Sequence, residues 1–187
     1  MNRTLTFASL NDFIFCPASI YFHGMYEGVE GLLFKDVPQV AGSHAHKEID
    51  LGILYSKDVI SSLFVYSQKY DVCGKIDKYF VKEKRLVECK KHINKVYDGY
   101  IYQLYCQYFG MIEAGFEVKE LYCYSIDDNK KYKVALPLED SEMLYAFEET
   151  LRSIHTFSLE RFSQNNIEKC KNCIYSNICA WGIADDE

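Results

Sequence analysis

The chain has 187 residues, of which 49% are hydrophobic, 16% are aromatic and only three are proline. This composition supports a sizeable core and excludes disordered, collagen-like and mucin-like chains. The length fits one domain, 1–187, and no linker or repeat divides it. The 21 Lys and Arg against 27 Asp and Glu give a formal charge of −6. Over the whole chain, this balance argues against a generic nucleic-acid binder, because non-specific affinity for phosphates comes from an excess of cations.

The N-terminal sequence MNRTLTFASLNDFIF lacks the basic segment, apolar run and cleavage site of a secretory signal. No apolar run approaches the roughly 18 residues of a membrane span. We therefore expect a cytoplasmic protein with no membrane partner. In that compartment the eight cysteines are expected to bind metal or to be buried thiols rather than disulfides.

The hydrophobic pattern predicts a mixed α/β order of elements. The first is a helix over 9–26, with Ser9 as its N-cap and an interruption at Cys16 and Pro17. A short helix after Gly42 follows. The later elements are a three-stranded meander at 63–66, 71–81 and 85–90, a helix over 98–113, strands at 118–126 and 131–136, a helix from 140 to about 162, and a cysteine-rich tail.

Two carboxylates and a lysine come together in the predicted meander. Glu88 and Lys90 alternate with Cys89 on one strand, so they point to the same face. If the hairpin closes through residues 82 and 83, Asp77 lies directly opposite Glu88 on that face. Facing carboxylates repel one another and are best tolerated with a divalent cation between them, and oxygen ligands suit Mg²⁺ or Mn²⁺.

A divalent ion held by Asp77 and Glu88 beside Lys90 can position water and stabilise charge on a phosphate, which predicts phosphodiester hydrolysis. The alternative is an ordinary surface hairpin whose charged residues form weak ion pairs. A third metal ligand is expected from the string VAGSHAHKEID. His46 and His44 are both candidates there, since neutral imidazole is a good ligand for such ions.

The tail contains Cys170, Cys173 and Cys179 in a C-x2-C-x5-C spacing that gathers three thiolates in one loop. Cys16, beside a proline at a helix interruption, is the best candidate for a fourth ligand. Four thiolates can hold zinc or an iron–sulfur cluster, and the spacing fits either. The set would close a loop of about 150 residues and clip the chain ends together. The other cysteines, which fall within strands or a helix, are expected to pack as small hydrophobes: Cys73, Cys89, Cys106 and Cys123.

These motifs occur together along nearly the whole chain. They are FIFCP with Cys16, VAGSHAH with His46, CGKID with Asp77, VECKK with Glu88 and Lys90, YQLYCQY with Gln103, and the terminal KCKNC. In this combination the chain resembles the RecB-like exonuclease family of CRISPR systems, the Cas-four family. The resemblance implies an α/β fold with a RecB-like PD-(D/E)xK restriction-endonuclease-like core, which is a mixed sheet flanked by helices. It also implies a [4Fe–4S] cluster that joins the N- and C-terminal segments.

The same resemblance implies a function and residue roles. Such a protein is a metal-dependent DNA exonuclease or endonuclease that trims single-stranded overhangs of prespacer DNA for the CRISPR acquisition integrase complex, in adaptive antiviral defence. Lys90 would orient the attacking water, and Gln103 would position Lys90 or the DNA. The remaining implied roles are ligands of Mn²⁺ or Mg²⁺ for His46, Asp77, Glu88 and the backbone carbonyl of Cys89, and ligands of the cluster for Cys16, Cys170, Cys173 and Cys179.

Two positions depart from the family pattern. A glutamine, Gln107, stands where the family usually has a tyrosine four residues after Gln103, and Tyr108 comes one residue later. Ala18 and Ser19 follow Cys-Pro, where the family commonly has a basic residue. Two other functions fit the same residues: a catalytically weak, cluster-stabilised DNA-binding adaptor of the integrase complex, and a restriction-type nuclease or zinc-clipped structural protein.

The net charge is unevenly distributed. Residues 69–95 hold nine Lys or Arg and four Asp or Glu, a local charge of +5 (9 − 4), which leaves −11 (−6 − 5) for the rest. The hairpin with the candidate site is therefore the expected DNA-binding face. Of the many aromatic residues, Tyr97, Tyr100 and Tyr102 near Gln103 are the candidates for stacking on unpaired bases.

Overall fold

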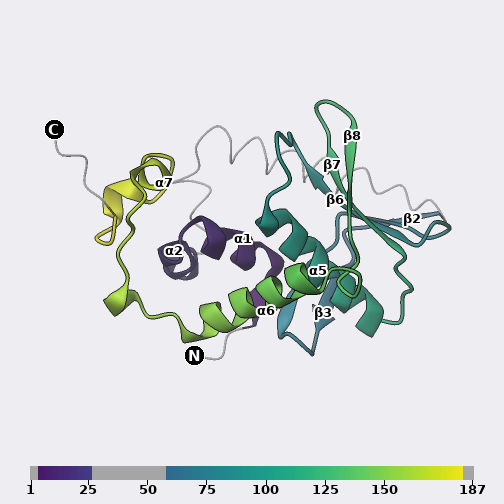
Figure 1. The fold of residues 1–187 in the computed structure, drawn as a ribbon, viewed down its shortest axis with the longest axis horizontal. Helices are drawn as coiled ribbons and strands as arrows, with labels where there is room; N and C mark the ends of the chain where they lie inside the picture. Colours follow the sequence, from purple (N-terminus) through teal and green to yellow (C-terminus); the bar gives the residue numbers. More distant parts are fainter. Residues whose placement is uncertain (1–3, 27–57, 183–187) are drawn as a thin grey trace.

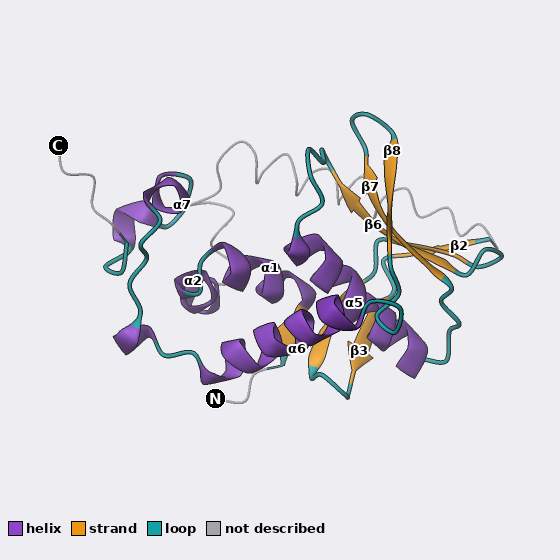
Figure 2. Ribbon diagram, in the orientation of Figure 1, coloured by secondary structure: helices purple, strands orange, loops and turns teal. Residues whose placement is uncertain are grey.

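The structure is a computed structural model that describes residues 4–26 and 58–182 (Figure 1, Figure 2). It has a mixed α/β architecture in which two mixed sheets are flanked by helices, and this confirms the predicted class at that level. None of the described helices is both long enough and apolar enough to cross a bilayer. The elements are β1 (Leu5–Thr6), α1 (Phe7–Phe15), α2 (Ala18–Tyr26), β2 (Val59–Ser61), β3 (Phe64–Ser67), β4 (Val72–Lys75), β5 (Lys78–Phe80), β6 (Arg85–Lys90), α5 (Asp98–Glu113), β7 (Glu120–Ser125), β8 (Lys130–Val134), α6 (Ser141–Thr156) and α7 (Ile167–Lys171), with 3₁₀ turns at Leu159–Arg161 and Ser176–Ile178.

The predicted N-terminal helix is interrupted at Cys16 and Pro17, as expected, and forms α1 and α2. The backbone of Cys16 is extended, at φ −157° and ψ 118°, because a following proline disfavours the helical region. The predicted start at Ser9 is wrong. Thr6 is the N-cap, and its hydroxyl accepts a hydrogen bond from the Ser9 N–H at 3.3 Å, so the helix begins two residues earlier than predicted.

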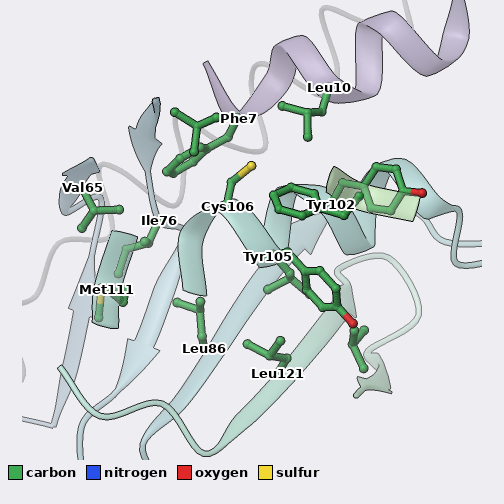
Figure 3. Packing of buried hydrophobic residues seen from close by; sticks show 14 of the residues in the cluster. Phe7, Leu10, Val65, Ile76, Leu86, Tyr102, Tyr105, Cys106, Met111 and Leu121 are labelled. Carbon is green, nitrogen blue, oxygen red and sulfur yellow. The ribbon is translucent and has the colours of Figure 1, made fainter. Parts of the chain in front are cut away.

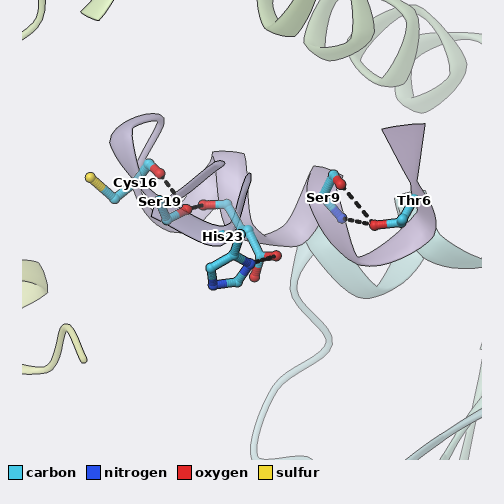
Figure 4. A network of polar contacts seen from close by, with 6 residues as sticks. Thr6, Ser9, Cys16, Ser19 and His23 are labelled. Carbon is cyan, nitrogen blue, oxygen red and sulfur yellow. Dashed lines mark hydrogen bonds and ion pairs between the residues drawn. The ribbon is translucent and has the colours of Figure 1, made fainter. Parts of the chain in front are cut away.

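Ser19 stabilises the break between α1 and α2 (Figure 4). Its hydroxyl lies 2.7 Å from the carbonyl oxygen of Cys16 and 2.9 Å from that of Asp12. Each carbonyl also accepts a backbone hydrogen bond at 2.9 Å, that of Asp12 from the Cys16 N–H and that of Cys16 from the Ser19 N–H. The hydroxyl therefore adds a further contact across the break.

The predicted meander is corrected in one respect. Its middle strand, 71–81, bends at Ile76 and Asp77, so that β4 and β5 belong to different sheets. The backbone N–H of Ile76 donates to the Leu63 carbonyl at 2.9 Å, and its carbonyl accepts from the Ser62 N–H at 3.0 Å. Ile76 itself is buried. Asp77 therefore lies at the corner where the chain passes from one sheet to the other.

The predicted register of the second hairpin is confirmed. β5 and β6 are antiparallel, and Lys78 is paired with Val87 and Tyr79 with Leu86. The strands are joined through residues 81–84, where Lys84 adopts a positive φ of 53°. Extending the register by one residue places position 77 opposite position 88.

The larger sheet has the order β2-β5-β6-β7-β8, and the smaller has the order β1-β4-β3. Within the larger sheet, β6 and β7 are parallel and the other neighbours are antiparallel. The long connection required by the parallel pair contains α5, which contacts strands of both sheets. This helix is therefore placed over the face of β6 that carries the candidate site.

The main core lies between α5, α1, α6 and the two sheets (Figure 3). Leu10 of α1, Leu86 of β6 and Leu121 of β7 are fully buried within it. Phe147 of α6 packs edge-on against Tyr105 of α5, with ring centroids 5.9 Å apart. Both rings therefore belong to the core.

Tyr102 belongs to the same core, which corrects its assignment as a candidate for DNA contact. It is only 4% exposed, and its ring lies 5.7 Å from that of Phe147. A side chain buried in this way cannot stack on a nucleobase. Tyr97, by contrast, is 55% exposed.

Candidate functional site

Asp77, Glu88 and Lys90 converge under α5. Glu88 and Lys90 lie two residues apart on β6, and Asp77 lies at the corner before β5, opposite Glu88. The Oδ2 atom of Asp77 accepts a hydrogen bond from the backbone N–H of Cys89 at 2.7 Å. The corner carboxylate is thus held against the strand that carries the other two residues.

Lys90 makes two short contacts with predicted site residues. Its Nζ lies 2.7 Å from Oε1 of Glu88 and donates to Oε1 of Gln103 at 2.6 Å. The same ammonium lies 5.0 Å from the centre of the Tyr100 ring, within range of a cation–π interaction. Gln103 therefore positions Lys90, which is one of the two roles predicted for it.

Burial dominates the electrostatics of this group. Glu88 is 3% exposed, and its pKa is raised first by burial and then by Asp77, while Lys90 and Gln107 oppose the shift. For Lys90, burial alone would lower the pKa, but attraction and hydrogen bonding to Glu88, with Asp77 adding to them, raise it overall. The lysine therefore holds its proton at neutral pH. A divalent cation here would oppose the repulsion that raises the pKa of Glu88.

Gln107 contacts the site, although the sequence analysis predicted no role for it and noted only that the resembled family usually has a tyrosine at this position. Its Nε2 donates to Oε2 of Glu88, and the side chain is 2% exposed. Gln103 and Gln107 are one helical turn apart on α5 and serve Lys90 and Glu88 respectively. The available signal was the i, i+4 spacing of two amides on an otherwise apolar helix face.

Replacing Gln107 with leucine tests whether this amide orients Glu88. Leucine is similar in size but apolar, so it removes the amide donor. We expect half-maximal cleavage to require about 10- to 100-fold more Mn²⁺, the usual cost of losing a group that orients a metal ligand. The matched control is Gln68→Leu, at an exposed turn. Equal Mn²⁺ dependence in both variants and the wild type would contradict the role.

The described residues provide no third side-chain ligand for the proposed metal ion. Within residues 4–26 and 58–182, no third Asp, Glu, His or Cys side chain joins the two carboxylates closely enough to hold one ion with them. His46 and His44, with the helix predicted after Gly42, lie outside the described residues. Burial raises the pKa of the Cys89 thiol to about 12, so only its backbone carbonyl, the predicted donor, is a reasonable ligand.

The structure brings the four predicted cluster cysteines into one region. Figure 1 shows α7 and the tail beside α2, and Cys16 packs in one apolar group with Cys173 and Cys179. Burial raises the pKa of Cys173; a hydrogen bond from the Tyr175 N–H opposes this, and Cys16, Cys179 and Cys170 add to it. The other three cysteines are thus within electrostatic range of Cys173.

The Sγ atoms of Cys170 and Cys179 both lie close to Gly182. A Cβ placed on this glycine would lie 3.4 Å from Sγ of Cys170 and 3.8 Å from Sγ of Cys179. The Sγ of Cys173 accepts a hydrogen bond from the Tyr175 N–H at 3.4 Å. Such N–H donors stabilise thiolate charge and tune sulfur ligands, but within residues 4–26 and 58–182 no group of three or more Cys, His, Asp or Glu side chains is arranged to hold a metal ion.

Aromatic side chains surround the cysteine group. Phe22 of α2 stacks on Tyr175, with ring centroids 5.0 Å apart and an interplanar angle of 18°. Trp181 lies edge-on to Phe22 at 6.0 Å. This second, smaller core joins the N-terminal helices to the tail.

The remaining cysteines have no such grouping among the described residues. Cys89, Cys106 and Cys123 are buried and Cys73 is half-buried, in agreement with their predicted packing as small hydrophobes. Burial raises the pKa of each, to about 12 for Cys123. They remain protonated and are poor ligands.

A lysine of the tail joins α7 to the N-terminal helices. Ala18 and Ser19, which follow Cys16 and Pro17, are both buried. Lys169 of α7 donates to the backbone carbonyl of Ile14, near the end of α1, at 3.0 Å. This contact holds the tail against α1.

Comparison with known proteins adds information about the fold. No protein-family model matches the chain, and no curated protein matches it. Among solved structures it is similar to the crystal structure of SSO0001, with a TM-score of 0.60 and 15% sequence identity. The match covers 98% of this chain and 89% of that one. At this identity the similarity shows a shared fold alone.

Proposed function

We propose that the chain is a metal-dependent deoxyribonuclease with a PD-(D/E)xK-type centre. The observation that carries the proposal is the arrangement of Lys90, which is held between Glu88 and Gln103 while Asp77 stands opposite Glu88. Two carboxylates can hold a divalent cation, and a protonated lysine beside them can stabilise the negative charge that develops during phosphodiester hydrolysis. The sequence resemblance supports DNA as the substrate, and single-stranded overhangs of prespacer DNA in particular.

Asp77, Glu88, His46 and the carbonyl of Cys89 would hold Mn²⁺ or Mg²⁺, which, when bound, polarises the phosphate and lowers the pKa of its water. Lys90 would stabilise the negative charge that develops on the phosphate oxygens. Gln103 and Gln107 would keep Lys90 and Glu88 in place. Cys16, Cys170, Cys173 and Cys179 would hold a [4Fe–4S] cluster that joins the two ends of the chain.

The test uses full-length protein purified without oxygen and an end-labelled DNA duplex with single-stranded overhangs. We expect the overhangs to shorten in Mn²⁺ or Mg²⁺ and to remain intact in EDTA, as judged on denaturing gels. Mixtures with an acquisition integrase complex then test that partnership, through co-elution and through altered cleavage positions. Intact DNA in every divalent ion would contradict the nuclease assignment.

One observation favours a second function, that of a DNA-binding adaptor of the integrase complex. Both oxygens of Glu88 are already engaged, Oε1 by Lys90 and Oε2 by Gln107. A carboxylate satisfied in this way binds a cation only if one of these contacts is given up. DNA binding and complex assembly without hydrolysis would support the adaptor.

A further inference from the structure

A cavity of about 350 Å³ lies between α5, the end of β8 and the beginning of α6. Its volume falls within the range of roughly 300–1,000 Å³ that is typical of pockets for small organic ligands. Among the described residues, no candidate metal ligand and no cysteine lines it. The cavity is therefore separate from both sites discussed above.

Tyr105 supplies an unused hydrogen-bonding group at this cavity. Its side chain lines the cavity and is fully buried, and its hydroxyl has no hydrogen-bond partner among the described residues. In Figure 3 the ring points away from Phe7 and Leu10, with its oxygen at the far end. Burial, followed by the charge of Asp140, raises the pKa of Tyr105 to about 12, so the hydroxyl keeps its proton at neutral pH. A buried donor of this kind costs free energy until it meets an acceptor.

Asp140 places a carboxylate at the same cavity. Its Oδ1 accepts a hydrogen bond from the Met143 N–H at 3.0 Å and so caps α6. This cap engages one of the two carboxylate oxygens, and the other can accept from a bound molecule. Tyr105 and Asp140 therefore offer one donor and one acceptor to the same ligand.

The walls of the cavity include the apolar side chains of Ile101, Val134 and Met143. Met143 is half-buried, and an unbranched side chain of this kind can shift to admit a ligand. Lys133 also lines the cavity, but its side chain is 66% exposed and its Nζ lies 3.9 Å from Oε1 of Glu120. Its charge is therefore partly neutralised, whereas the carboxylate of Asp140 disfavours an anion inside.

From this arrangement we infer that the cavity binds a small, uncharged organic molecule in which a carbonyl and an N–H group are neighbours, as in a primary or cyclic amide. The carbonyl oxygen accepts from the Tyr105 hydroxyl, the N–H donates to Asp140, and the apolar part packs against Ile101, Val134 and Met143. The inference is independent of the proposed nuclease, because it uses none of the residues assigned to the metal centre.

The experiment titrates benzamide, a planar apolar ring with a primary amide, into isotope-labelled full-length protein and follows the backbone amide resonances around the cavity by NMR. A ligand this small is expected to bind with a Kd of about a millimolar. Tyr105→Phe removes only the hydroxyl and should raise the Kd about 2- to 12-fold, which corresponds to one hydrogen bond between neutral groups. Its thermal unfolding should be unchanged, because the hydroxyl has no partner among the described residues. Tyr145→Phe, at a tyrosine of α6 that is 62% exposed, is the matched control and should bind like the wild type.

Benzoate is the comparison probe, because it has nearly the same shape but is an anion without a donor. It should bind the wild type at least about 10-fold more weakly than benzamide does. Asp140→Asn keeps an oxygen that can cap α6 and removes the charge, so it should narrow this difference.

Three results would overturn the inference. No saturable shift with millimolar benzamide would mean that the cavity takes water only. Benzoate bound as tightly as benzamide by the wild type would exclude the assigned class of ligand. Equal Kd values for Tyr105→Phe and the wild type, or a lowered melting temperature in Tyr105→Phe, would assign the hydroxyl to the fold instead of to a ligand.

Discussion

Replacing Lys90 with alanine is expected to reduce Mn²⁺-dependent DNA cleavage by at least about 100-fold, the usual loss when a donor to developing charge is removed. The ammonium is positioned by Glu88 and Gln103, and no other lysine of β6 shares its face. Lys131→Ala is the matched control, because Lys131 is an exposed strand lysine of β8 and lies outside the expected DNA-binding face of residues 69–95. Rates would be measured under single-turnover conditions with enzyme in excess. Loss of activity in both variants, or in neither, would contradict the assignment.

Removing Lys90 also leaves a buried carboxylate without its cation, so a variant that disturbs the fold less is needed. Asp77→Asn keeps the shape and an oxygen that can accept from the Cys89 N–H, but it removes one charge. We expect a comparable loss of cleavage with unchanged thermal unfolding and much weaker binding of Mn²⁺, measured by calorimetry. Cleavage that survives both Asp77→Asn and Lys90→Ala would exclude this site as the nuclease centre.

Replacing Cys170 with serine is expected to remove the proposed cluster and to lower the melting temperature by roughly 10 °C or more. Opening a loop of about 150 residues costs about 4–5 kcal/mol by loop-closure entropy, and each kcal/mol is worth about 2–4 °C for a protein of this size. Wild-type protein prepared without oxygen should be brown, with absorbance near about 400 nm, about four irons per chain and labile sulfide. Iron and sulfide assays with thermal melts provide the measurement.

The control for Cys170 is Cys73→Ser, because Cys73 is half-buried and lies in β4, away from the tail. It should keep full iron content and melt close to the wild type. One zinc per chain without sulfide would replace the cluster by a zinc site. An unchanged melt in Cys170→Ser would show that the four thiols do not clip the chain ends together.

The carboxylate pair could be predicted because it depends on local geometry. Alternation along β6 puts Glu88 and Lys90 on one face whatever the rest of the chain does, and a short hairpin fixes the residue opposite Glu88. The break at Cys16 is also local, because the following proline disfavours a helical backbone at Cys16. The positions of these features could therefore be predicted from short stretches of sequence.

The errors come from features that depend on packing. Nothing in the alternation of 71–81 marks the corner at Ile76, which arises because its backbone bonds to residues 62 and 63 of the preceding loop. Tyr102 and Tyr97 look alike in sequence, yet α6 covers the first and leaves the second exposed. Gln107 reaches Glu88 only because α5 packs on β6. The hydrophobic pattern of a helix does not specify which strand the helix packs on.

If Asp77 and Glu88 hold a metal ion as proposed, the corner at Asp77 makes the separation of these two ligands depend on both sheets. Asp77 follows the smaller sheet and Glu88 belongs to the larger, so the separation of their carboxylates depends on the angle between the sheets. α5 packs on strands of both sheets, and the Cys89 N–H holds Asp77 against β6. Mg²⁺ requires oxygen ligands at about 2.0–2.1 Å, whereas Ca²⁺ takes about 2.3–2.6 Å. Core substitutions beneath α5, far from any ligand, would therefore change which cation radius the protein accepts.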